Sequence, residues 1–432
     1  MKLEEYLVRE DGMVPKVRYV SRRFAELEME RLWPRVWQVA CREEEIEEVG
    51  SYLEYVIGDQ SILVVRSDPQ RIQGFHNTCL HRGTRLAEGC GRFAECEIRC
   101  RYHAWRYHLD GRVKEIVDAH EFGDIPADLR LREVRVERFG GFVFVNMDPD
   151  APALLEFLHP VPAWLGAYRL EEMRFYSHKT TILPANWKVV VDAFNEGYHV
   201  QGTHPQILPW TDDVSMEYEQ FDTHAHYGRL PSARRLLRPS PRLGIPDDEV
   251  DEWQILSGLV GGLGGLFYKD EQRIVDELRE TELPPGQTLL EAYQRRRRDL
   301  LASRGLDVSL FTPDQMTSAD DFYWFPNVVG PVYPGTAIMF RVRPNGLDPD
   351  SAVMDLWTLQ WPGGEGWRAC EHKVYPDWTA KDWGTITNQD FSNMVHVQTG
   401  MKSRACGDLR LNPRQEANIL HMHRVIDRYL TG

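Results

Sequence analysis

Cys79-Leu80-His81-Arg82-Gly83 and Cys100-Arg101-Tyr102-His103-Ala104-Trp105 are two short segments that each supply one cysteine and one histidine. Eighteen residues separate His81 from Cys100. Zinc loops usually pair cysteine with cysteine or histidine with histidine. Two loops that each carry one cysteine and one histidine suit a two-iron cluster, in which the cysteines hold one iron and the histidines hold the other. The pattern predicts such a cluster on Cys79, His81, Cys100 and His103, with a structural zinc site as the alternative.

The residues around these segments have strand patterns. Residues 52–66 are rich in Tyr, Ile and Val, and Gly58-Asp59 provides turn chemistry, so a hairpin is predicted there. A strong strand at 141–146 ends in Asp148-Pro149-Asp150, which marks a domain boundary. We therefore expect an all-β domain at residues 38–150.

The two Cys/His segments resemble the Rieske [2Fe–2S] motif of ring-hydroxylating oxygenases. The common motif has Gly where Ala104 stands. Respiratory-type Rieske proteins add a cysteine in each loop, and Cys90 and Cys96 are not at those positions, which favours the oxygenase branch. The resemblance implies an α+β fold, in which an all-β Rieske domain is inserted in a helix-grip (START/Bet v 1-like) catalytic domain with an antiparallel sheet. The catalytic domain would span residues 151–432 and include an N-terminal helix within 1–37.

An oxygenase needs a second metal site, because the cluster has no open coordination position for oxygen. Two histidines and a carboxylate on one face are the ligands of non-haem iron that activates oxygen. Asn186-Trp187-Lys188, followed by His199 and His204, resembles the family's catalytic-domain signature and implies that these histidines hold iron. Asp390 lies in a segment that resembles the family's C-terminal ligand segment, so it is the expected third ligand, with Asp382 as the alternative.

Three polar residues precede these histidines on a predicted helix that begins at Trp187 and is expected to end near Gly202. Many family members have Asp at the position of Glu196, where it bridges a cluster histidine of one subunit to an iron histidine of its neighbour. Glutamate there resembles some homotrimeric members, including quaternary-amine oxidising relatives. The resemblance implies that Glu196 fixes two imidazole tautomers and carries electrons, with Asp192 and Asn195 beside it.

Composition limits the other possibilities. The 432 residues carry 51 Lys+Arg and 66 Asp+Glu, a net charge of −15, which argues against nonspecific nucleic-acid binding. No apolar run is long enough to span a membrane, and the acidic N-terminus lacks a signal-peptide pattern. Seven cysteines are sparse for this length and suit a reducing compartment, so a cytoplasmic location is expected.

Electrons must come from a partner. The glycines of residues 257–265 do not form a dinucleotide-binding fingerprint, so NAD(P)H is expected to act only through a separate reductase, with or without a ferredoxin. Between Cys79 and Arg112, seven arginines stand against four acidic residues. That local charge either steers an acidic electron donor or is ordinary surface charge. The Gly-rich segment is either a pocket edge or a surface loop.

The resemblance to ring-hydroxylating oxygenases also implies the type of reaction. We expect the terminal oxygenase of a multicomponent system, a homotrimer or an α3β3 assembly, that hydroxylates or dihydroxylates an aromatic or other hydrophobic small molecule. An oxidative N- or O-demethylase is the alternative within the family, and an electron-transfer protein without catalytic iron is the alternative outside it. Residues 322–327 either line the substrate pocket or belong to the core. Arg341 and Arg343 either meet a substrate carboxylate or lie exposed on a strand, and His421 and His423 are expected at the surface.

Overall fold

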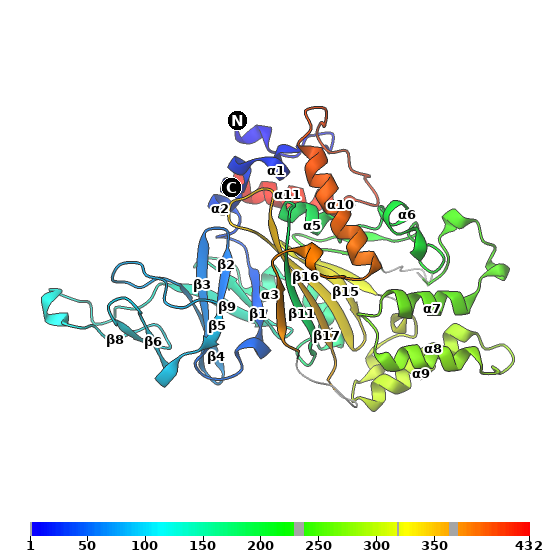
Figure 1. Cartoon of the computed structure of the whole chain (residues 1–432), viewed down its shortest axis with the longest axis horizontal. Helices are drawn as coiled ribbons and strands as arrows, with labels where there is room; N and C mark the ends of the chain where they lie inside the picture. Colours follow the sequence, from blue (N-terminus) through cyan, green and yellow to red (C-terminus); the bar gives the residue numbers. More distant parts are fainter. Residues whose placement is uncertain (1, 229–236, 318, 363–369) are drawn as a thin grey trace. The chain divides into compact units, whose positions relative to one another are not determined.

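The computed structural model describes residues 2–228, 237–317, 319–362 and 370–432. The chain forms two compact units (Figure 1), one made of Met1–Ala25 with Pro160–Gly432 and one made of Glu26–His159. Both contain sheets whose strands are almost all antiparallel, and the larger unit adds most of the helices. The predicted fold class, a mixed α and β protein with antiparallel sheets, is confirmed.

The smaller unit contains two antiparallel sheets. The first has the strand order β1-β10-β9-β4-β3-β2-β5 and the second the order β6-β7-β8. Their bounds are β1 Gln38–Arg42, β2 Ser51–Ile57, β3 Gln60–Asp68, β4 Arg71–His76, β5 Cys90–Arg92, β6 Glu97–Arg99, β7 Arg106–His108, β8 Val113–Glu115, β9 Glu133–Phe139 and β10 Phe142–Asn146.

The core of this unit explains its strand pattern. Every residue of β10 is buried, which accounts for its continuous apolar run. A tight turn at Gly58 joins β2 to β3, and a Cβ there would approach Sδ of Met29 to 2.1 Å. A cluster of buried apolar side chains, which includes Phe75, contains both Cys79 and Cys100. The sheets thus hold the two cysteines inside the core.

The larger unit is built on one eight-stranded sheet with the order β12-β13-β14-β15-β16-β17-β11-β18. Its strand pairs are antiparallel except for β11 and β18, which are parallel. The bounds are β11 Arg174–Leu183, β12 Tyr218–Gln220, β13 Ala225–Tyr227, β14 Asp320–Trp324, β15 Val328–Tyr333, β16 Thr336–Pro344, β17 Ala352–Gln360 and β18 His372–Tyr375.

Helices pack on this sheet and on one another. Helix α5 contacts β16 and β17, helix α10 contacts α5 and α6, and helices α7, α8 and α9 pack side by side (Figure 1). The helix bounds are α1 Val17–Val20, α2 Arg22–Arg31, α3 Leu154–Phe157, α4 Val161–Leu165, α5 Trp187–Asp192, α6 Val200–Thr203, α7 Glu252–Gly262, α8 Lys269–Arg279, α9 Leu289–Ser303, α10 Thr385–Met401 and α11 Ala417–Thr431.

The Gly-rich segment forms a helix rather than a loop. Asp251 caps α7 by accepting the backbone N–H groups of Trp253 and Gln254. A Cβ at Gly258 would meet the Trp210 ring at 2.2 Å, so this glycine allows the helix to approach the indole closely. None of the helices in the described part of the chain is long and apolar enough to cross a membrane.

Candidate metal centres

The two Cys/His segments form two closed turns. The backbone N–H of Gly83 donates to the carbonyl of Cys79 (2.9 Å), and that of Ala104 donates to the carbonyl of Cys100 (3.1 Å). The turn residue is left-handed in both, with φ of 75° at Gly83 and 58° at Ala104. Glycine adopts this conformation freely, whereas alanine is strained there. The departure from the common motif thus falls on a position that favours glycine.

The four side chains of these turns fit the predicted iron–sulfur cluster. Both cysteines are free and buried. The rings of His81 and His103 lie 4.4 Å apart, and His81 stacks on Trp105 at 5.2 Å. Nδ1 of His81 is buried and has no hydrogen-bond partner among the described residues. A bound metal ion would give that nitrogen a partner, and a buried polar atom without a partner is costly.

The arginines near these turns are largely engaged in ion pairs. Five of them lie within ion-pair distance of carboxylates, namely Arg85, Arg92, Arg101, Arg106 and Arg112. Arg82 lies over the ring of Tyr102. Arg82 and Arg99 form no ion pair in the described part of the chain. The hydrogen bond from Lys114 lowers the pKa of Glu97, and the charge of Arg99 contributes to this lowering.

Three side chains converge in the larger unit. His199 directly precedes α6, His204 directly follows it, and Asp390 lies on α10. Oδ1 of Asp390 is 2.7 Å from Nε2 of His204 and 3.7 Å from Nε2 of His199. One ligand atom from each residue lies within 4.8 Å of the others. Two imidazole nitrogens and a carboxylate in this arrangement fit a divalent iron with open positions.

Asp382, the alternative ligand, is placed elsewhere. Its Oδ1 accepts the backbone N–H of Gly384 and the side-chain amide of Asn388, at the start of α10. It is not part of the group that contains His199 and His204. Of the two carboxylates considered from the sequence, the structure brings Asp390 to the histidines.

The other nitrogen of each histidine is also held. Nδ1 of His199 donates to Oε1 of Glu196 (2.6 Å), and Nδ1 of His204 donates to Oε1 of Gln389 (2.8 Å). Burial lowers the pKa of His199, but the hydrogen bond to Glu196 and the charges of Glu196 and Asp390 outweigh it and raise the pKa above its usual value. Both rings are therefore fixed with Nε2 toward Asp390. Sequence reasoning missed Gln389, although it is adjacent to Asp390.

Behind Glu196 lies a buried polar network. The hydroxyl of Tyr19 donates to Oδ2 of Asp192 (2.7 Å) and lies 2.5 Å from Nε2 of His423. Burial raises the pKa of Asp192 to about 8. His423 is fully buried, so its predicted surface position is wrong. The amide of Asn195 is buried without a hydrogen-bond partner among the described residues. Asp192 and Asn195 thus precede Glu196 in the sequence but form no hydrogen bond to it in the described part of the chain.

A cavity of about 870 Å³ adjoins the three converging residues. Its volume lies in the range of pockets for small organic molecules. Helix α7 and the turn after it contribute five glycines to the wall, so this segment is a pocket edge. Residues 322–327 do not line the cavity, and Phe322, Tyr323 and Trp324 are buried in the core instead.

Arg341 and Arg343 are neither exposed nor directed at the cavity. Nη2 of Arg341 lies 2.8 Å from Oδ2 of Asp355, and Nη2 of Arg343 lies 3.3 Å from the same atom. Burial raises the pKa of Asp355, but the two guanidinium groups outweigh it and hold the pKa well below its usual range. Both arginines are thus occupied by a buried carboxylate.

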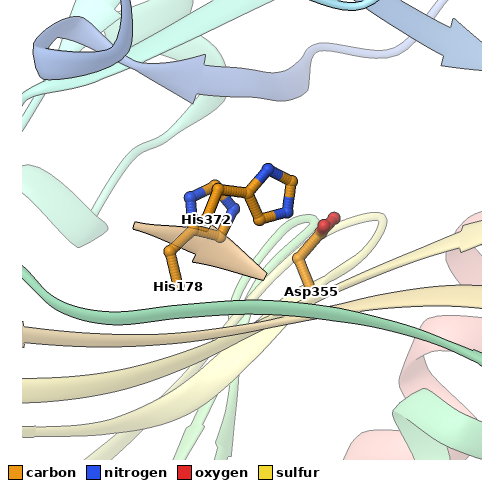
Figure 2. A group of neighbouring side chains, drawn as sticks. All are labelled: His178, Asp355 and His372. Atoms are coloured by element: carbon orange, nitrogen blue, oxygen red, sulfur yellow. The ribbon is translucent and has the colours of Figure 1, made fainter. Parts of the chain in front are cut away.

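Asp355 also belongs to a second His/Asp group (Figure 2). The rings of His178 and His372 stack at 3.8 Å with an interplanar angle of 12°. Stacked parallel rings do not direct their nitrogens to one point. Oδ1 of Asp355 accepts the hydroxyl of Thr180, which also lies 2.7 Å from Nε2 of His372. Because the carboxylate is already paired to arginine and the two imidazoles are stacked, we assign no metal to this group.

Comparison with known families decides the identity of the chain. Residues 36–129 match the Rieske [2Fe-2S] domain, and residues 169–261 and 268–432 match the catalytic domain of the ring hydroxylating alpha subunit. The chain is a Rieske oxygenase alpha subunit. It is therefore an oxidoreductase and the terminal oxygenase component of a Rieske system. Its cofactors are a [2Fe–2S] cluster and a mononuclear iron, as predicted from the sequence, and it works with a reductase on a small molecule.

Curated relatives of this Rieske oxygenase include oxygenase subunits that are named for quaternary ammonium compounds. The glycine betaine monooxygenase oxygenase subunit of Chromohalobacter salexigens is 30% identical over 397 residues, which cover 91% of this chain and 80% of the relative. The carnitine monooxygenase oxygenase subunit of Escherichia coli is 31% identical over 226 residues, which cover 51% of this chain and 58% of the relative.

Solved structures share the fold of this Rieske oxygenase. A quaternary ammonium Rieske monooxygenase in complex with L-carnitine superposes with a TM-score of 0.67 at 18% identity and covers 99% of both chains. Naphthalene 1,2-dioxygenase with indole bound gives a TM-score of 0.66 at 17% identity, with 99% of this chain and 94% of that chain covered.

Proposed function

We propose that this chain is a monooxygenase that hydroxylates a carbon attached to the nitrogen of a small quaternary ammonium compound. One oxygen atom enters the C–H bond and the other leaves as water, with two electrons from the reductase and two protons. The resulting α-hydroxyalkyl ammonium ion loses its hydroxyl proton and breaks its C–N bond, which releases a tertiary amine and an aldehyde. This is the oxidative N-demethylase alternative when the carbon is a methyl group, and the names of the relatives favour it over an aromatic substrate.

The observation that carries the proposal is the aromatic wall beside the converging ligands. The rings of Phe194 and Phe340 lie 4.2 Å apart, and both line the cavity. The hydroxyl of Tyr227, another lining residue, donates to the carbonyl of Phe194 and ties the wall together. Aromatic faces attract quaternary ammonium ions through their quadrupoles, with about 0.5–2 kcal/mol for each contact. The wall begins two residues before Glu196, so a bound cation would lie close to the site.

Each site residue then has a role in this proposal. Cys79, His81, Cys100 and His103 hold the cluster, and His199, His204 and Asp390 hold the mononuclear iron. When bound, these groups supply the electrons and the redox chemistry that reduces oxygen.

The residues around the ligands position the two imidazoles and exclude water. Glu196 and Gln389 hold the two imidazoles in one orientation, and the apolar walls limit the water that reaches the substrate. Glu196 also provides the electron route from a cluster in a neighbouring subunit. Asp192, bonded to Tyr19, and Asn195 support the segment that carries Glu196. We further propose a homotrimer, a reductase or ferredoxin donor, and a cytoplasmic location.

A single-turnover experiment tests this function without the partner protein. Purified protein is loaded with iron, reduced chemically and exposed to oxygen with glycine betaine, carnitine, choline or naphthalene. We expect an aldehyde and the corresponding amine from at least one quaternary ammonium compound, in amounts close to the mononuclear iron present, which is one third of the total iron. Oxygenated naphthalene without any amine product would overturn the proposal in favour of an aromatic substrate. An iron content that accounts only for the cluster after reloading would favour an electron carrier.

A further inference from the structure

Lys179 is a cation at the wall of the cavity. It lies on β11, opposite Leu356 of β17, and Ser177 of the same strand also lines the cavity. It is the one lysine or arginine among the described residues of the lining, where the other charged side chains are Glu196, Asp321, Asp390 and the two histidines. The cavity is therefore acidic and aromatic on the side of the converging ligands and basic at β11.

The ammonium of Lys179 is half-buried, and it forms no hydrogen bond or ion pair with any residue in the described ranges. Burial lowers its pKa, and the charges of Lys381 and Lys373 lower it further. Lys373 is its partner on β18, and Lys381 follows shortly before α10. These three positive charges are near one another, and Lys179 has no counterion among the described residues. A bound anion would therefore relieve both its desolvation and its repulsion.

The arginines that might have taken this role are already paired. Arg341 and Arg343 bind Asp355, so among the described residues of the lining Lys179 is the cationic side chain that can meet a ligand. Trp383 also lines the cavity, and the ammonium of Lys381 lies 5.5 Å from the centre of the Trp383 ring. Lys381 itself donates to the carbonyl of Asp382, so it is held outside the lining.

We propose that Lys179 binds a carboxylate of the substrate, so that the substrate is a zwitterion with a quaternary ammonium group at one end and a carboxylate at the other. The inference rests on the proposed function and narrows it. The cation lies against Phe194 and Phe340, and the carboxylate meets Lys179, which is in one row of the sheet with Leu356 and Phe340. A compound such as choline, with a hydroxyl where glycine betaine has a carboxylate, lacks the second contact.

The test compares binding of matched ligands to the iron-loaded oxidised protein by calorimetry. Glycine betaine and choline share the trimethylammonium group and differ in the carboxylate, and benzoate carries a carboxylate without the cation. We expect Lys179→Gln to lower the affinity for glycine betaine at least about tenfold, because a charge-assisted bond is lost. The affinity for choline should stay within about twofold of the wild-type value. Lys179→Arg should retain most of the affinity for glycine betaine. Lys269→Gln, at the exposed start of α8 and outside the lining of the cavity, should change the affinity for neither ligand.

The outcomes separate the two ideas. Equal weakening of glycine betaine and choline in Lys179→Gln, or no change in either, overturns the role of Lys179 and leaves the proposed function standing. Wild-type protein that binds benzoate through Lys179 but neither quaternary ammonium compound overturns the proposed function and leaves Lys179 as a carboxylate-binding residue. Wild-type protein that prefers choline to glycine betaine overturns the zwitterionic substrate.

Discussion

Oδ1 of Asp390 lies 2.7 Å from Nε2 of His204, although the two positions are 186 apart in the sequence. The contact joins α10 to the end of α6 and brings His199 into the same group. All three residues line the cavity. A ligand set that faces the cavity leaves its remaining coordination positions accessible to a small molecule, which is what an oxygenase requires.

Asp390→Asn should empty the mononuclear site and leave the cluster intact, because an amide is a poor replacement for a charged ligand. We expect iron affinity to fall by more than ~100-fold, beyond the ~10–100-fold typical for residues that only support a ligand. Iron analysis with absorption and EPR spectra of the cluster measures both sites in one sample. Asp382→Asn is the matched control and should keep both. The reverse result would make Asp382 the ligand.

Glu196→Gln should load both metal sites and fail in turnover. The glutamine oxygen can still accept the Nδ1–H of His199, so the ring keeps its orientation. The charge is lost, and with it the electron route proposed for Glu196. Rapid-mixing spectroscopy of the reduced protein with oxygen and substrate should show a cluster that stays reduced while the wild-type cluster is oxidised. Wild-type rates of cluster oxidation in this variant would remove Glu196 from the electron route.

Gln389→Ala should weaken iron binding about 10–100-fold without abolishing it, because His204 loses the acceptor that fixes its ring. Iron titration of the apoprotein at the mononuclear site gives the affinity directly. Asn393→Ala is a suitable control on the same helix, since Asn393 bonds to Thr203 and not to a histidine. Equal loss in both variants would point to a displaced α10 rather than to the His204 contact.

Candidate ligands that are close together in the chain could be grouped from their spacing, whereas contacts between distant segments could not. Cys79, His81, Cys100 and His103 occupy two local turns, so their spacing alone indicated a shared centre. Gln389 could not be assigned because its role depends on α10 packing beside His204. The pairing of Arg341 with Asp355 depends on the register of β16 and β17, where the two residues are directly opposite.

The helix predicted from Trp187 to Gly202 is in fact two short helices. Helix α5 ends at Asp192, and α6 begins at Val200. The carboxylate of Glu196 accepts the backbone N–H groups of Tyr198 and His199, a local bond that competes with helix continuation. This break, rather than a turn after a long helix, places His199 and His204 at the two ends of α6. The spacing of apolar residues in the sequence does not reveal such a side-chain contact.

Asp192→Asn should flatten the pH dependence of stability. The pKa of Asp192 is about 8 in the folded protein, against about 3.9 for an unfolded chain. Between these values the folded state binds the proton and the unfolded state does not, so rising pH lowers the free energy of unfolding. Asparagine has no proton to lose, and the contribution should disappear.

Denaturant unfolding of the metal-loaded protein at pH 5, 6.5 and 8 measures this effect. Wild-type protein should lose more stability across the series than Asp192→Asn. Tyr19→Phe is the companion variant, because it removes the hydrogen bond to Asp192 and keeps the carboxyl. It should retain the slope, and parallel pH profiles for wild type and Asp192→Asn would contradict a buried protonated carboxyl.

Ala104→Gly should stabilise the Rieske domain. Ala104 has φ of 58°, where a residue with a Cβ costs about 1–2 kcal/mol, and glycine has no such penalty. The greater freedom of glycine in the unfolded chain returns about 0.4–1 kcal/mol of this, so the net gain is roughly 1 kcal/mol or less. Loss of the cluster's visible absorption on heating should move to higher temperature. Ala94→Gly, at a position without positive φ, should move it lower or leave it unchanged. A lower transition for Ala104→Gly would mean that the methyl group of Ala104 stabilises the loop by more than its backbone strain costs.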